Sequence, residues 1–143
     1  MPKSVGPVNV AILAVPEVAA SAIFGMVDLF SSAGRDFEFI TRGTAGEQRM
    51  RPKKEKKTKN CFSAANGIRI QPDHDFSDCP KPEIVCIPDL YVNPAESVAG
   101  LYDPEALWLK EVHDDGAMLA SACSGAILLG EAGLLTNCEA TTH

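Results

Sequence analysis

Short apolar runs alternate with helical patterns along the 143-residue chain, and this alternation limits the possible folds more than any other feature. Three runs are short, apolar and consistent with buried strands: residues 8–15 (VNVAILAV), 83–87 (EIVCI) and 117–122 (AMLASA). Apolar residues at helical spacing predict three helices: residues 19–33, 104–115 and 125–135. Strands that alternate with helices favour an α/β fold with a mainly parallel sheet flanked by helices.

Glycine, proline and capping residues set the expected ends of these helices and strands. Gly34 and Gly116 are typical of helix C-termini, and Asp103 followed by Pro104 is typical of an N-cap and a first helical residue. Three further strands are expected in residues 37–41 (FEFIT), after the turn in 66–73 (NGIRIQPD) and from 140–142.

Length and composition suit one domain with a real core, since 45% of the residues are apolar. The apolar runs are too short to cross a bilayer, and the N-terminus lacks the pattern of a signal peptide. The expectation is therefore a cytoplasmic protein without a membrane partner. The single tryptophan, Trp108, is expected in the core or at an interface.

The cysteines and histidines do not form a metal-binding pattern. The chain has five widely spaced cysteines without a CxxC motif: Cys61, Cys79, Cys86, Cys123 and Cys138. This spacing favours reduced thiols, most of them inert and buried, over a disulfide framework or zinc site. His74 is expected in a turn and His113 on the surface of a helix, so neither a metal nor a cofactor is predicted.

A basic run occupies residues 49–59 (RMRPKKEKKTK), with seven of the 13 Lys and Arg residues and one Glu. Its local charge is +6. Because the net charge of the whole chain is −6, the remaining residues carry −12. The run could contact an anionic surface, but a solvated loop is the more ordinary interpretation.

The stretch LASACSGAILLGEAGLL places Cys123 at the junction between a predicted strand and a predicted helix. Small neighbours such as Ser124 and Gly125 are typical of a nucleophile elbow, which exposes one reactive side chain. The helix N-terminus would favour a thiolate and lower the pKa of Cys123. A buried cysteine that closes the strand is the structural alternative.

Four stretches together resemble one family: VAILAVPEVAASAIFGMVDLFSSAG, NGIRIQPD, EIVCIPDL and ASACSGAILLGEAGLLTNCEATTH. They resemble the DJ-1/PfpI superfamily, which has a flavodoxin-like fold of the class I glutamine amidotransferase type. The nearest branch is the N-terminal domain of AraC-type transcriptional regulators. The resemblance covers residues 8–143 and fits the basic run least.

The resemblance implies roles for several residues. Cys123 is the candidate nucleophile or sensor thiol, and His143 and Glu17 are weaker catalytic candidates. The ligand-contacting candidates lie after the predicted strands: Pro16, Asp89, Leu90, Ser124 and Gly125.

Three positions depart from the family pattern. Ala22 stands where the family often has a carboxylate, and Ser124 replaces the histidine or alanine that follows the cysteine in protease-like and chaperone-like members. Asp89 and Leu90 replace a glycine pair that supplies an oxyanion-hole amide. These departures favour binding or sensing over efficient catalysis.

The family's domain continues past the TTH segment, so a C-terminally incomplete domain is expected, with DNA contacted only through a domain absent from this chain. The expected partners are an unknown small-molecule ligand and a second copy in a homodimer.

Three hypotheses for function remain open. The first is a small-molecule or redox-sensing domain of an AraC-type regulator, non-catalytic or weakly catalytic. The second is a cysteine-dependent hydrolase, amidase or hydratase. The third is an interaction module in which Cys123 is structural.

Overall fold

The computed structural model describes residues 8–36, 41–43 and 61–141. The main sheet contains four parallel strands in the order β2-β1-β5-β6. Its strands are β1 (Val8–Ile12), β2 (Thr41–Gly43), β5 (Ile84–Ile87) and β6 (Met118–Ser121). Two short antiparallel strands, β3 (Phe62–Ser63) and β4 (Arg69–Ile70), form a separate hairpin. The fold is therefore the predicted α/β class.

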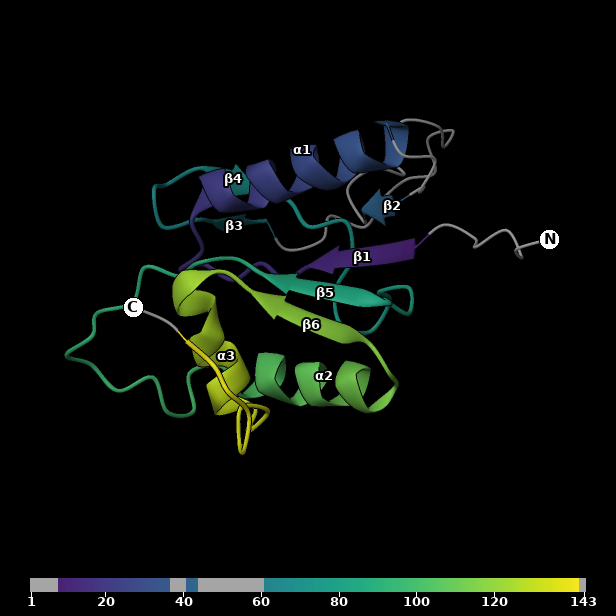
Figure 1. Cartoon of the computed structure of the whole chain (residues 1–143). Coiled ribbons are helices and arrows are strands. Elements are labelled where there is room, and N and C mark those ends of the chain that lie inside the picture. Colours follow the sequence, from purple (N-terminus) through teal and green to yellow (C-terminus); the bar gives the residue numbers. More distant parts are fainter. Residues whose placement is uncertain (1–7, 37–40, 44–60, 142–143) are drawn as a thin grey trace.

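Helices cover both sides of this sheet (Figure 1). The chain passes from β1 through α1 (Ala20–Asp36) to β2, and from β5 through α2 (Asp103–Asp114) to β6 in the opposite direction. Because parallel crossovers are right-handed, the two connections place α1 and α2 on opposite faces. The strand order thus changes direction between β1 and β5, the point where ligands bind in open α/β sheets.

The core forms where strand residues meet the helices. In the register of the sheet, Ala11 lies opposite Val85, and Val85 lies opposite Leu119. The side chains of Val85, Leu109 and Leu128 are fully buried, and they belong to one apolar cluster. The apolar periodicities in the sequence therefore identify the faces that pack together.

Two of the predicted helix ends are wrong. Gly34 lies inside α1, because a single glycine costs a helix only about 1 kcal/mol and does not force its end. Asp103 is the first residue of α2, while Tyr102 occupies the N-cap position and its side chain makes no capping hydrogen bond. Gly116 does end α2, at a φ of +97°, as predicted.

The last helix is shorter than expected. A 3-10 turn (Cys123–Gly125) precedes α3 (Ala126–Glu131), whose end is set by Gly133 at a φ of +69°. The Leu134 N–H donates to the Leu129 carbonyl and the Gly133 N–H to the Gly130 carbonyl, a Schellman motif. The described residues 140 and 141 form no strand.

Other expectations fall partly or wholly outside the described residues. Residues 37–40 of the predicted FEFIT strand lie there, and β2 begins at Thr41. The basic run 49–59 and His143 also lie outside the described part of the chain. The turn before β4 is present as predicted.

The cysteines are more exposed than predicted. Only Cys86 is buried, and burial raises the pKa of its thiol. Cys79 is half-buried, and the remaining three are exposed. All five are free cysteines in the structure. Trp108 is buried and His113 is exposed, as expected.

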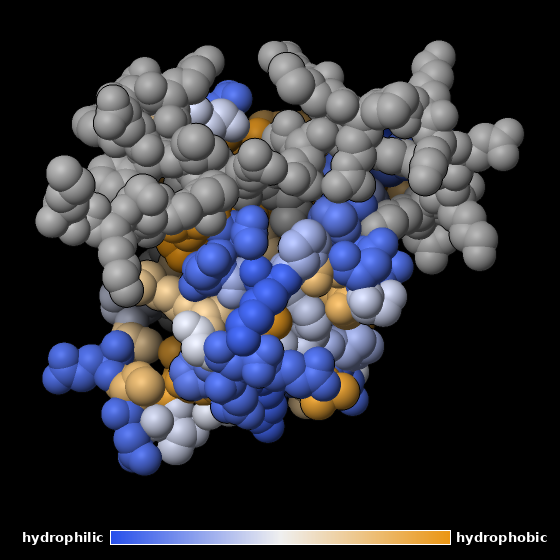
Figure 2. Space-filling model, turned by 90° about the vertical axis from the view of Figure 1, so that its right-hand side faces the viewer, coloured by the Kyte–Doolittle hydropathy of each residue, from blue (hydrophilic) through white to orange (hydrophobic). Residues whose placement is uncertain are grey.

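The end of the sheet where the strands begin is largely hydrophilic. Figure 2 shows this end, with charged and polar surface over most of the described residues and scattered apolar side chains. Lys81 and Asp115 form an exposed ion pair of 3.3 Å there. No helix within the described ranges is long and apolar enough to span a bilayer.

Candidate functional site

Cys123 lies at a sharp turn between β6 and α3. Ala122 is still extended, and its N–H donates to the Ile87 carbonyl at 2.9 Å. The next residue, Cys123, has a φ of +49°, a left-handed conformation that costs an L-residue about 1–2 kcal/mol. Its side chain is exposed. The structural alternative of a buried cysteine closing the strand is therefore wrong.

Gly125 allows this turn to press against the end of β5. A Cβ atom at Gly125 would lie 2.4 Å from the Pro88 carbonyl oxygen and 2.7 Å from the Ile87 carbonyl oxygen. No side chain fits at those distances, and both atoms belong to the backbone. The Cys123 turn (residues 122–125) is therefore held directly over the carboxyl end of β5.

Ser124 ties the turn to the loop that follows β5. The Leu90 N–H donates to the Ser124 hydroxyl at 2.8 Å, and the hydroxyl donates to the Leu90 carbonyl at 2.8 Å. Leu90 is 6% exposed, so these bonds satisfy both backbone groups of a buried residue. Ser124 thus has a structural role that sequence reasoning missed.

The loop after β1 joins the same arrangement. Val18 and Leu90 form an isolated antiparallel bridge, in which the Tyr91 N–H donates to the Glu17 carbonyl at 2.8 Å. The Ala19 N–H donates to the Asp89 carbonyl at 3.1 Å. Backbone bonds and the Ser124 hydroxyl therefore connect all three carboxyl-end loops at the point where the strand order reverses.

Tyr102 is a residue that sequence reasoning missed at this edge of the sheet. It is 3% exposed, and its hydroxyl has no hydrogen-bond partner of ordinary geometry within the described residues. Burial raises the pKa of Tyr102 to about 12, together with the negative charge of Glu17, a hydrogen-bonding contact with the Glu17 carboxylate and the charge of Glu105. The available signal in the sequence was an aromatic residue directly before the predicted N-cap, Asp103.

The structure brings together most of the predicted positions. The loops that carry Glu17, Asp89 and Leu90 are connected through backbone bonds, and Ser124 and Gly125 contact the end of β5 or its loop. Pro16 is exposed on the loop after β1. His143 lies outside the described residues, so its role stays a prediction.

Metal ligation finds no support in the described ranges, where no group of three or more His, Cys, Asp or Glu side chains could hold an ion. Ala22 lies half-buried on α1. The functional groups at this edge include the Cys123 thiol, the buried Tyr102 phenol and the Glu17 and Asp89 carboxylates.

Comparison with known proteins gives one curated relative and several similar structures. No family model matches the chain. Isonitrile hydratase from Pseudomonas putida is 29% identical over 83 residues, which are 57% of this chain and 34% of that protein. The chain thus spans about a third of the length of that relative.

The structural matches are closer in shape than in sequence. An AraC family transcriptional regulator from Pseudomonas putida matches with a TM-score of 0.69 at 14% identity, over 96% of this chain and 67% of that one. DJ-1beta from Drosophila melanogaster matches with a TM-score of 0.58 at 15% identity, over 90% and 61%. The chain therefore has the DJ-1/PfpI type of flavodoxin-like fold, which confirms the expected fold class.

Proposed function

We propose that this chain is a small-molecule or redox-sensing domain of an AraC-type transcriptional regulator, with weak catalysis or none. Cys123 is its sensor thiol, at a turn of the nucleophile-elbow type. The loops that carry Pro16, Glu17, Asp89 and Leu90 form the surrounding ligand site. The observation that carries the proposal is the pair of hydrogen bonds between Ser124 and Leu90.

Those bonds remove groups that catalysis needs. Covalent catalysis by a thiol requires a base and donors for the developing oxyanion. The Leu90 N–H already donates to Ser124, and the Ser124 proton already goes to the Leu90 carbonyl. Ala22 adds no carboxylate to activate the thiol. The exposed thiol is therefore better suited to binding or oxidation than to turnover.

Ligand recognition can use the polar groups at the same edge. The Tyr102 hydroxyl is buried without a partner of ordinary geometry in the described part, beside the charge of Glu17. A polar ligand at this edge would meet the Glu17 carboxylate, which already interacts with that hydroxyl. This supports a small polar molecule as the ligand.

One observation favours a second candidate, a cysteine-dependent hydratase. The chain is 29% identical over 83 residues to isonitrile hydratase. The exposed Cys123 at a φ of +49° has the backbone strain that is often found at active sites. In this alternative, the Cys123 thiol adds to the substrate carbon to form a thioimidate, water then attacks the same carbon, and the carbon–sulfur bond breaks to release the formamide and the free thiol.

Turnover of an alkyl isonitrile distinguishes the two functions. The purified chain and its Cys123→Ser variant are incubated with the isonitrile, and the N-alkylformamide formed by hydration is measured. We expect no formation above that of the variant. Formation that depends on Cys123 would establish the hydratase and overturn the sensing proposal in its non-catalytic form.

Thiol oxidation tests the redox-sensing part of the proposal in the same protein. Hydrogen peroxide is added with a sulfenic-acid trap, and labelling is followed by mass spectrometry. Cys61 and Cys138 are also exposed and serve as internal references. Faster labelling of Cys123 supports redox sensing, and equal labelling of all three thiols leaves small-molecule binding as the sensing mode.

The proposal also covers DNA contact, oligomeric state and cellular location. We assign DNA contact to a separate domain of the regulator, and we expect a homodimer in the cytoplasm. Exposed apolar side chains on α1, Phe24 and Leu29, are consistent with self-association. Light scattering coupled to size exclusion measures the oligomeric state, and a monomer at high concentration contradicts it.

A further inference from the structure

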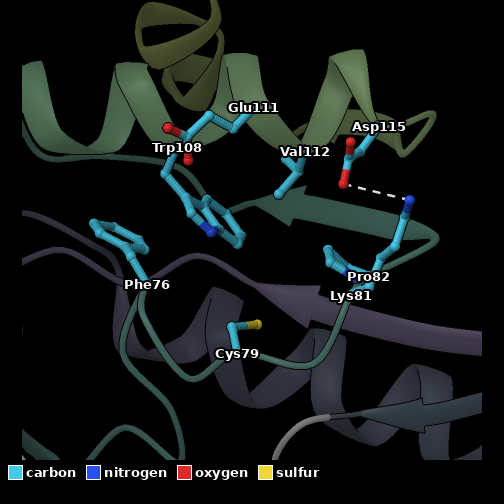
Figure 3. Close-up of a pocket in the computed structure, with 8 residues that line it drawn as sticks. All are labelled: Phe76, Cys79, Lys81, Pro82, Trp108, Glu111, Val112 and Asp115. Carbon is cyan, nitrogen blue, oxygen red and sulfur yellow. Dashed lines mark ion pairs between the residues drawn. The ribbon is translucent and has the colours of Figure 1, made fainter.

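A groove of about 220 Å³ lies between α2 and residues 75–82, and none of its lining residues belongs to the Cys123 turn. Phe76 and Trp108 form one end, Lys81 and Asp115 form the other, and Cys79 lies between them (Figure 3). Pockets for drug-sized molecules are usually larger, about 300–1,000 Å³. The groove therefore suits a small molecule.

Aromatic side chains line one end of the groove. The rings of Phe76 and Trp108 are stacked, with centroids 5.1 Å apart and planes 23° apart. Trp108 is 8% exposed and anchored in the core, whereas Phe76 is 41% exposed. Val112 and the side chain of Cys79 continue the apolar surface. A ligand with an aromatic body would bury apolar area here.

The segment that carries Phe76 is held in one shape. The Ser77 N–H and hydroxyl donate to the Asp75 carboxylate at 2.8 and 2.5 Å, and the Asp75 N–H donates to the Asp78 carboxylate at 2.9 Å. The Ser77 hydrogen bonds hold the pKa of Asp75 below its usual value. Because this turn is fixed before binding, less conformational entropy is lost when a ligand enters.

Acidic charge dominates the rim. Glu111 on α2 and Asp115 at its C-cap are four residues apart, and both line the groove. Lys81 pairs with Asp115 at 3.3 Å, whereas Glu111 forms no ion pair within the described part of the chain. Figure 3 shows the Glu111 carboxylate turned toward Trp108. The groove thus combines an aromatic wall with one uncompensated negative charge.

We propose that this groove binds small arylalkylamines, with the aromatic body against Phe76 and the exposed part of Trp108 and the ammonium group at Glu111. The charge and the aromatic rings both favour a cation. This inference does not rest on the function proposed for Cys123, because it uses none of the same residues. It adds a second ligand site on a different part of the fold.

Trp108 is the only tryptophan in the chain, so its fluorescence reports directly on the groove. The test titrates the full chain with phenethylamine and, separately, with 3-phenylpropionate, which has a similar body and a negative head group. We expect a saturable change in Trp108 emission at millimolar amine, and binding of the carboxylate at least fivefold weaker. Equal responses to both compounds, or no saturable response to the amine, overturn the proposal.

A matched pair of variants tests the role of the rim charge. Glu111→Gln and Asp114→Asn each remove one negative charge from exposed positions of α2, but only Glu111 lines the groove. We expect Glu111→Gln to weaken amine binding about two- to fivefold, as for an exposed ion pair, and Asp114→Asn to leave it unchanged. Equal effects of the two substitutions contradict the assignment to Glu111.

Protection of Cys79 provides a second readout in the same samples. The thiol of Cys79 lies in the groove, whereas the thiol of Cys61 does not line it. Bound phenethylamine should slow alkylation of Cys79 and leave the rate at Cys61 unchanged. An unchanged Cys79 rate at saturating amine places the binding elsewhere and overturns the proposal.

Discussion

The hydroxyl of Ser124 and the backbone of Leu90 exchange two hydrogen bonds of 2.8 Å each, across 34 residues of sequence. The contact holds the Cys123 turn against the loop that follows β5. It satisfies the N–H and the carbonyl group of Leu90, which is buried. It also occupies the Leu90 N–H and the Ser124 hydroxyl, which a catalytic site could otherwise use. The stability of the candidate site should therefore depend on this one side chain.

Replacement of Ser124 by Ala leaves the Leu90 N–H and carbonyl without their side-chain partner. Unsatisfied buried polar groups cost about 1–3 kcal/mol, so we expect a loss of that size in the free energy of unfolding. Urea denaturation measures it. Ser121→Ala changes an exposed serine of β6 and is the control, with an expected effect within about 0.5 kcal/mol. Equal effects would show that the Leu90 contact is not stabilising.

Gly125→Ala and Gly130→Ala should have opposite effects on stability. The Cβ added at Gly125 meets the Pro88 and Ile87 carbonyl oxygens, and the overpacking should cost about 1–3 kcal/mol or more. Nothing lies within 4 Å of a Cβ at Gly130, inside α3, so alanine there should stabilise the helix by up to about 1 kcal/mol. Thermal denaturation of both variants checks the signs. A neutral Gly125→Ala would contradict the close approach.

The left-handed conformation of Cys123 predicts a difference between two substitutions that both remove the thiol. Cys123→Gly relieves the strain of the φ of +49°, while Cys123→Ala keeps it. We expect the glycine variant to be more stable than the alanine variant by about 1 kcal/mol, although glycine is ordinarily the less stable choice. Chemical denaturation of the two proteins measures the difference. A more stable alanine variant would indicate a turn without strain.

Tyr102→Phe should not destabilise the protein at neutral pH, because it removes a buried hydroxyl that has no partner of ordinary geometry in the described residues. At high pH the two proteins should diverge. The pKa of Tyr102 is raised to about 12 in the folded state, against about 10 in an unfolded chain. The stabilisation from the raised pKa is complete below pH 10 and is lost as the pH rises toward 12.

The measurement for Tyr102 is the free energy of unfolding of both proteins between pH 8 and pH 11. The wild-type protein should lose more stability than Tyr102→Phe over this range. Cys86 also has a raised pKa, but it is present in both proteins and its effect cancels in the comparison. Parallel pH profiles would show that the Tyr102 hydroxyl is accessible to water.

The pattern of apolar residues predicted the fold class because it records which faces are buried. The runs around Val10, Val85 and Leu119 became parallel strands, and the helix that contains Trp108 and Leu109 packs its apolar side on the core. The ends of elements were harder to predict. Gly34 and Gly133 are both glycines, yet of the two only Gly133 ends a helix. It does so through backbone hydrogen bonds that depend on the local conformation.

Some features of the candidate site could also be predicted from the sequence, and others could not. Cys123 and its small neighbours were recognisable in the sequence, because a strand-to-helix turn restricts residue size locally. The exposure of Cys61 and Cys138 was not predicted, since burial of a cysteine depends on what packs over it.

The sequence alone determined the alternation of strands and helices, the parallel sheet and the position of Cys123 at a turn, because each depends on residues close together in the chain. Only the tertiary structure decided that Ser124 bonds to Leu90, that Tyr102 is buried beside Glu17, and that Phe76 stacks on Trp108. These contacts join segments that are distant in sequence. Their partners are chosen by the packing of the whole sheet and its loops, which no local pattern records.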